Sequence, residues 1–146
     1  MEILSVIPEK IKTAGRILFN GQATGVGDSK GVKPAGSNGL TLLCLVTMAN
    51  AADLVLTVQT GDDADLTNPV DIADNIPIFK NDIRQTDAKT FTVDDDSGLF
   101  VVVFNVPPIL IPTDKYCGIT FGNSNAANIL SSIALDDTYH EMGPSA

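Results

Sequence analysis

Apolar and polar residues alternate along several short segments of this chain, and the clearest begins at Leu54 with the sequence Leu-Val-Leu-Thr-Val-Gln-Thr. Its first, third and fifth residues fall on one side of an extended segment, which is typical of a β-strand with one buried face. The pattern stops at the acidic residues 61–65, and Asn68-Pro69 then turns the chain before the alternation resumes at Val70. This pattern predicts two strands joined by a long acidic loop.

Similar apolar segments follow one another with turn residues between them, and we expect strands at 40–48, 54–60, 70–73, 77–79, 89–93, 99–106, 115–121 and 129–135. Short strands at this spacing predict an all-β protein, a single β-sandwich or jelly roll over residues 40–136. The turns at 94–98 and 122–128 predict hairpins. Leu99 to Val106 is apolar on both faces, so its second face needs cover from the N-terminal arm, the Pro-rich residues 107–112 or a neighbouring chain.

The two ends of the chain differ from this central part. Residues 20–39 are rich in glycine, which argues against regular structure, although 16–19 could form a short strand. We therefore expect residues 1–39 to form an extended N-terminal arm with a flexible segment, and 137–146 to form a polar C-terminal tail. The arm carries apolar residues that could bind a partner, while packing of residues 1–19 on their own sandwich stays open. These residues are Ile3, Leu4, Val6, Ile7 and Ile11.

Composition limits the partners. The chain has 146 residues, enough for one domain, and a net charge of −9, which argues against direct binding to nucleic acid. No apolar run is long enough to span a bilayer, so no membrane partner is expected. The first residues lack the basic region of a signal peptide, which predicts synthesis in the cytoplasm.

The residues that could carry chemistry are few. The one histidine, His140, lies in the polar tail, and no catalytic or nucleotide-binding motif occurs, so we expect neither an enzyme nor a cofactor. Cys44 and Cys117 lie inside expected strands and are interpreted as buried thiols. The acidic loops at 62–65 and 94–96 are the one metal possibility, because calcium favours clustered oxygen ligands. We prefer to interpret these aspartates as turn residues whose carboxylates are solvated. The alternative is that Asp62, Asp63 and Asp65 are calcium ligands.

Two segments resemble the small capsid decoration, or cement, proteins of tailed bacteriophages. The first is Leu54 to Ile72, a strand that leads into an acidic loop, Asn-Pro and another strand. The second is Lys115-Tyr-Cys-Gly-Ile-Thr-Phe with the strand from Ile129 to Leu135. The resemblance implies a jelly roll on the outer capsid surface of the virion. There it would bridge and stabilise subunits of the major capsid protein, as a homodimer or homotrimer, without catalytic residues. The alternative is a tail-associated or soluble receptor- or carbohydrate-binding β-sandwich module.

Overall fold

The computed structural model describes residues 16–34 and 39–136, which form a two-sheet β-sandwich of eleven strands and one short 3-10 helix. This confirms the all-β class and the sandwich. In chain order the elements are β1 (Arg16–Ala23), β2 (Asp28–Val32), β3 (Leu40–Met48), β4 (Leu54–Gly61), β5 (Val70–Asp71), β6 (Ile78–Lys80), β7 (Ile83–Arg84), β8 (Thr90–Val93), β9 (Gly98–Val106), η1 (Pro108–Leu110), β10 (Tyr116–Phe121) and β11 (Ile129–Asp136).

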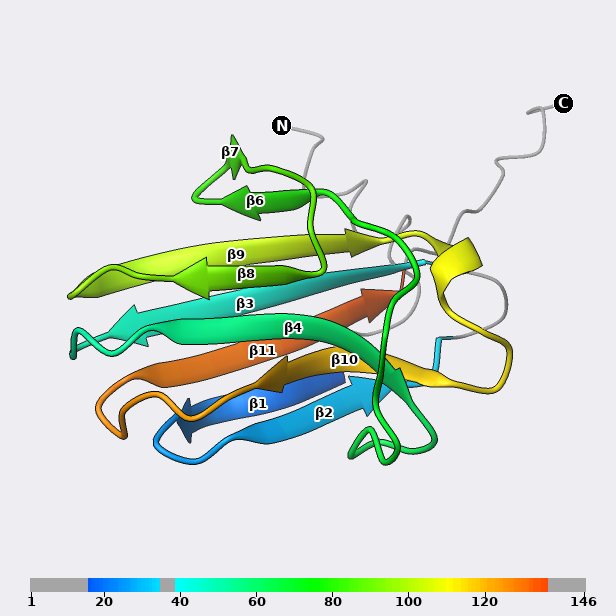
Figure 1. The fold of residues 1–146 in the computed structure, drawn as a ribbon, viewed down its shortest axis with the longest axis horizontal. Helices are drawn as coiled ribbons and strands as arrows, with labels where there is room; N and C mark the ends of the chain where they lie inside the picture. Colours follow the sequence, from blue (N-terminus) through cyan, green and yellow to red (C-terminus); the bar gives the residue numbers. More distant parts are fainter. Residues whose placement is uncertain (1–15, 35–38, 137–146) are drawn as a thin grey trace, which may run out of the picture.

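The strands are distributed between the two sheets in jelly-roll order (Figure 1). The six-stranded sheet has the order β1-β11-β3-β9-β6-β7; the five-stranded sheet has the order β2-β10-β4-β5, with β8 also paired to β4. The antiparallel pairs β1 with β11, β2 with β10, β3 with β9 and β4 with β8 are those of one long hairpin rolled into two layers. Strands β5 to β7 belong to the connection between β4 and β8.

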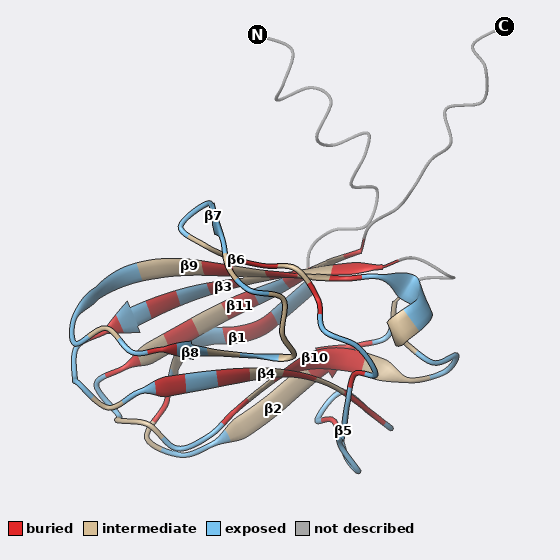
Figure 2. Ribbon diagram, turned by 45° about the horizontal axis from the view of Figure 1, so that its top comes forward, coloured by how far each residue is buried: buried red, intermediate tan, exposed pale blue. Residues whose placement is uncertain are grey.

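The core lies between the sheets and follows the alternation of the sequence. Along β4 and β3, buried and more exposed residues alternate, as the banded ribbons of Figure 2 show. Leu54, Leu56 and Val58 are fully buried, which confirms the face predicted for this strand. The rings of Phe19 and Phe121 meet edge to face across the two sheets, with centroids 5.2 Å apart.

The expectation for residues 20–39 is wrong at 20–23 and 28–32, because these residues belong to β1 and β2, which are strands of the jelly roll. Leu18 and Phe19 are buried in the core, so the described sandwich begins at Arg16 rather than at residue 40. Gly31 allows the side chain of Leu66 to pack closely against β2, because a Cβ at this position would overlap it. Gly21 has φ +60° beside a register shift in the β1–β11 pairing, where a left-handed backbone suits a bulge.

The two predicted hairpins are also wrong. The turn at 94–98 joins β8 of the five-stranded sheet to β9 of the six-stranded sheet, and 122–128 joins β10 to β11 in the same way. A tight turn shows only that the chain reverses direction. It does not show whether the second strand pairs with the first or crosses to the other layer, because that depends on partners far away in the sequence.

Buried polar groups at one end of the sandwich connect its loops. The side chain of Asn128 is fully buried, and its Oδ1 accepts hydrogen bonds from the backbone N–H groups of Ala49 and Asn50, at 2.8 and 2.9 Å. Its Nδ2 donates to the carbonyl of Ala52 at 2.9 Å and to Oγ of Ser124 at 3.1 Å. Asn128 therefore holds the β3–β4 connection against the β10–β11 connection.

A charged pair connects the first and last described strands. Arg16, at the start of β1, donates from Nη2 to Oδ2 of Asp136 at 3.0 Å and to the carbonyl of Lys33 at 2.7 Å. The Asp136 side chain is only 2% exposed, whereas that of Arg16 is 43% exposed. The guanidinium thus neutralises a buried carboxylate at the point where β1 begins beside the end of β11.

Both cysteines are buried, as predicted, and we expect them to be unreactive in the native protein. Burial raises the pKa of Cys44 to about 12, and burial likewise raises the pKa of Cys117 to about 12. At pH 8 a thiol reagent should therefore label neither cysteine until the protein is unfolded, when it should label both.

The same shifts set a pH dependence. The pKa values of both thiols in the folded protein lie above the ordinary 9.0. The free energy of unfolding that comes from keeping these thiols protonated is therefore complete below pH 9 and is lost as the pH rises toward 12. Urea unfolding between pH 8 and pH 11 should show this loss, and a variant with alanine at both positions should show a shallower decline. Equal slopes for the two proteins would contradict the assignment.

Candidate functional site

The outward side of the six-stranded sheet is the most distinctive surface of the described residues, and we call it the apolar face. Along β3, β9 and β11 the side chains that point away from the core are mainly aliphatic, instead of the polar residues usual on a solvated sheet. Leu99 is 61% exposed, Ile17 66% and Leu45 42%. The side chains that form the apolar face are Ile17, Leu43, Leu45, Phe79, Leu99, Val101, Val103, Ile129, Ile133 and Leu135.

Strand register aligns these side chains into a row across five strands. Ile17 of β1 pairs with Ile133 of β11, and Ile133 pairs with Leu43 of β3. Leu43 pairs with Val103 of β9, which pairs in turn with Phe79 of β6. Directly opposed residues have Cβ atoms about 4.5–5.5 Å apart, so the row is a continuous apolar strip.

The row ends at a cation on one side of the sheet. The guanidinium of Arg84 on β7 lies over the ring of Phe79, with its Cζ 5.6 Å from the ring centroid. Arg84 also donates to the carboxylate of Asp87 at 2.7 Å. The apolar strip is therefore bordered by charged residues at β7, the arrangement of an apolar centre with a polar rim that protein-binding surfaces show.

The outward side of the five-stranded sheet is polar by comparison. Thr57 on β4 faces Thr90 on β8, with their hydroxyl oxygens 3.2 Å apart, and Gln59 donates to Asp71 at 2.7 Å. Val55 is the exposed aliphatic residue on this side of β4, at 38%. The two outer surfaces of the sandwich thus differ in chemistry.

The acidic loop, residues 62–69, closes over one edge of this polar sheet. Its Leu66 is 1% exposed and has φ 52°, and it packs over Gly31 and Gly61, where a Cβ would overlap it. The backbone N–H of Gly31 donates to the carbonyl of Ala64 at 2.9 Å. The loop therefore covers the edge strand β2, which limits pairing of that edge with another chain.

The three aspartates proposed as alternative calcium ligands are engaged in holding this loop. Asp63 accepts from the backbone N–H of Thr67 at 3.1 Å and from its hydroxyl at 2.7 Å, and these hydrogen bonds lower the pKa of Asp63. Asp62 pairs with Lys115, and Asp65 pairs with Lys30. Hydrogen bonds from Asn68 and then Lys115 lower the pKa of Asp62.

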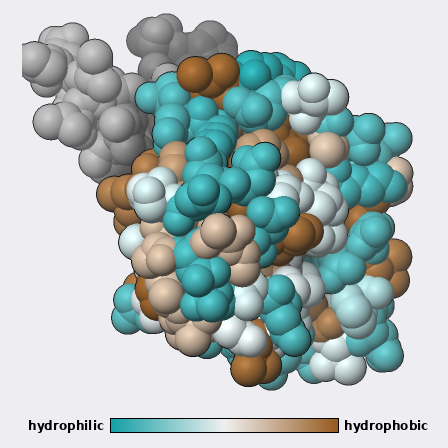
Figure 3. Space-filling view, turned by 60° about the vertical axis from the view of Figure 1, so that its left-hand side comes forward, coloured by the Kyte–Doolittle hydropathy of each residue, from teal (hydrophilic) through white to brown (hydrophobic). Residues whose placement is uncertain are grey.

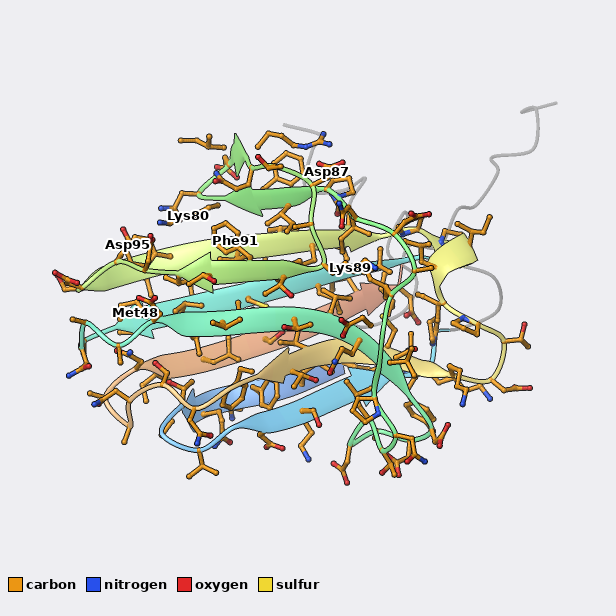
Figure 4. The ribbon with its side chains drawn as sticks, viewed as in Figure 1. Met48, Lys80, Asp87, Lys89, Phe91 and Asp95 are labelled. Atoms are coloured by element: carbon orange, nitrogen blue, oxygen red, sulfur yellow. The ribbon has the colours of Figure 1, made fainter. Side chains whose placement is uncertain are left out.

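The second acidic turn also uses its carboxylates locally. Asp95 pairs with Lys80 of β6, and both residues are labelled in Figure 4. The Lys80 ammonium lies over the ring of Phe100, 4.7 Å from its centroid. Within residues 16–34 and 39–136, no three His, Cys, Asp or Glu side chains are placed to hold a metal ion.

One end of the sandwich, at the left of Figure 1, carries the turns that join β1 to β2, β3 to β4, β8 to β9 and β10 to β11. This end offers no comparable surface. In the view that brings this end forward, hydrophobic groups are separated by hydrophilic ones and form no continuous patch (Figure 3). Val26, which is 75% exposed at the turn between β1 and β2, is a single residue of the kind common on soluble proteins. The apolar face, which gathers aliphatic side chains from several adjacent strands, is therefore the candidate binding surface.

The structure brings together some of the predicted residues and does not test others. The apolar arm residues (Ile3, Leu4, Val6, Ile7 and Ile11) and His140 lie outside the described residues. The double-sided apolar pattern of Leu99 to Val106 was noticed in the sequence, but the matching outward residues of β3 and β11 were missed. The signal for them was present, since Leu43 and Leu45 break the polar alternation of β3.

In the residues that the structure describes, no helix is long and apolar enough to cross a membrane. No protein-family model matches the chain, and neither a curated protein nor a solved structure matches it.

Proposed function

We propose that this protein is a structural virion protein of the capsid decoration type, which binds the outer shell of a tailed-phage capsid and stabilises it by bridging major capsid subunits. The observation that carries the proposal is the apolar face, set on a jelly roll whose opposite surface is polar. Such two-sided chemistry suits a domain that lies on another protein with one sheet and faces solvent with the other.

The segments that resemble decoration proteins support the same proposal. Leu54 to Ile72 folds as β4, the acidic loop and β5, with Gln59 paired to Asp71 across the two strands. The second segment folds as β10 and β11, and β11 contributes Ile129, Ile133 and Leu135 to the apolar face. The second of the resembling segments thus helps to build the surface that the proposal uses.

The apolar face is smaller than the area that a stable complex with the capsid would bury. Four strand spacings of about 4.8 Å and six residues of about 3.3 Å give a strip of roughly 20 Å by 20 Å. A stable protein interface buries about 800 Å² on each partner, so this area supplies about half of it. The remainder would come from the polar rim, which includes Arg84 and Asp87.

A charge placed on the apolar face should strongly weaken binding to capsids. Leu45→Lys puts an ammonium at the centre of the face, and burying it unpaired should weaken binding at least about tenfold. The measurement is co-sedimentation with capsids that have been stripped of this protein. Val55→Lys, at a site of similar exposure on the polar sheet, is the matched control and should bind as the unmodified protein does.

Copy number separates this proposal from the alternative. A decoration protein should be present in many copies in each purified particle, whereas a receptor-binding module at the tail should be present in few. Quantitative mass spectrometry of purified virions measures this. Absence from the particles, or equal binding by the Leu45→Lys and Val55→Lys proteins, would contradict the proposal.

A further inference from the structure

The described chain begins at one end of the apolar row. Arg16 is the first described residue, and the next residue, Ile17, is the first member of the row that runs through Ile133, Leu43 and Val103 to Phe79. Ile17 is 66% exposed although it lies beside Ile133 on the same face. Any segment that precedes Arg16 therefore starts at the edge of the apolar face.

The sequence before Arg16 has the composition that such a surface requires. Residues 1–15 contain five aliphatic residues within nine positions, and their charged side chains are two glutamates and two lysines. The rest of the chain is strongly acidic, so this segment differs from it in having balanced charge. The aliphatic residues are Ile3, Leu4, Val6, Ile7 and Ile11.

The length of the segment is sufficient to cover the row. Fifteen residues reach up to about 50 Å when extended, at about 3.3 Å for each residue. The row crosses four strand spacings, which is about 19 Å. The segment can therefore cross the whole strip from β1 to β6 and place its aliphatic residues on it.

A second copy of the chain, like the capsid, would need contacts beyond the apolar face to bind stably. Two apolar faces packed together would each bury roughly 400 Å² of strip, about half of the 800 Å² per partner that stable complexes need. A covalently attached segment does not pay for bringing two molecules together, so a smaller area is enough for it to dock.

We propose that residues 1–15 dock on the apolar face of their own chain and cover it in the free protein. The aliphatic residues of the segment contact the row from Ile17 to Phe79 and remove it from water. The capsid partner then displaces the segment when it binds. Only this displacement rests on the proposed function, because the cover itself is a property of the free protein.

Single introduced cysteines can test whether residues 1–15 cover the apolar face, since both native thiols are buried and are not expected to react with a thiol reagent. Leu45→Cys reports the apolar face and Val55→Cys reports the polar sheet, and the native side chains are 42% and 38% exposed. In the full-length free protein, we expect the cysteine at 45 to label about tenfold more slowly than the one at 55, the factor for about 1.4 kcal/mol of docking. Deleting residues 1–15 should make the two rates equal.

A full-length variant repeats the test without shortening the chain. Serine at four aliphatic positions of the segment (I3S, L4S, V6S and I7S) should speed labelling at 45 as the deletion does and leave labelling at 55 unchanged. A circular dichroism spectrum with the strand content of the full chain would confirm that both proteins are folded. If deletion destroys the sandwich, residues 1–15 belong to the core, and the docking model is overturned.

Two further results would overturn the proposal. One is equal labelling at 45 and 55 in the full-length protein. The other is protection at 45 that survives the deletion and increases with protein concentration, which would assign the cover to a second copy. All of these measurements are made without capsids, so failure of capsid binding would not affect them.

Discussion

Replacing Asn128 with alanine should lower the free energy of unfolding by about 3 kcal/mol, because it removes several hydrogen bonds to part-buried backbone groups of the β3–β4 connection. The side chain is fully buried and accepts hydrogen bonds from the N–H groups of Ala49 and Asn50 while it donates to the carbonyl of Ala52. Alanine supplies neither the acceptor nor the donors, and it leaves a space too enclosed for bulk water. Urea unfolding followed by circular dichroism measures the change.

The neighbouring Asn50 provides the control. It is exposed, and its side chain accepts one local hydrogen bond, from the N–H of Ala52 at 2.9 Å. Asn50→Ala should therefore cost less than about 1 kcal/mol, since water can replace that bond. A loss of the same size in both variants would show that burial of Asn128 does not dominate its effect.

A methyl group at Gly118 should destabilise the protein by about 3 kcal/mol, the upper part of the range for overpacking. Gly118 of β10 lies opposite Gly31 of β2, and a Cβ at 118 would overlap the carbonyl oxygen of Lys30 and the Cα of Gly31. These are backbone atoms, so no side-chain rotation can relieve the overlap. In Gly118→Ala, β2 must move away from β10, and urea unfolding should report the loss.

Gly122 is the matched control for this change. It lies just beyond the end of β10, and a Cβ there would meet no atom within 4 Å. Gly122→Ala should leave the free energy of unfolding within about 0.5 kcal/mol of the original value, as for most surface substitutions. If Gly118→Ala is tolerated equally well, the close approach of β2 to β10 is not a constraint on this fold.

The sequence was sufficient to predict the strands that carry a local pattern. In β4 the alternation of Leu54, Leu56 and Val58 marks the buried face, and the structure confirms it. The two-sided apolar run of β9 is visible in the structure, where Leu99, Val101 and Val103 point away from the core, and the expected cover of that second face stays a prediction. Periodicity and residue type report burial directly, so such elements are accessible without a structure.

The missed elements depend on contacts between distant residues. Strand β2 contains Gly31 and little apolar sequence, and it is a strand because β10 and the acidic loop provide its hydrogen bonds. Leu66 stands among aspartates, yet it is buried because the glycines of two strands leave room for it. The alignment of Ile17 with Phe79 through three intervening strands follows from register, which no local pattern encodes.

The pairing of β1 with β11 also has a consequence for synthesis of the chain. Strand β11 is the last strand of the described chain, and it lies between β1 and β3 in the six-stranded sheet. Until the ribosome has released it, β1 and β3 have no partner on their facing edges, and the sheet cannot close. The six-stranded sheet can therefore close only after β11 has been made, with slow kinetics set by long loop closures. Nascent chains truncated before Ile129 expose strand edges that invite aggregation.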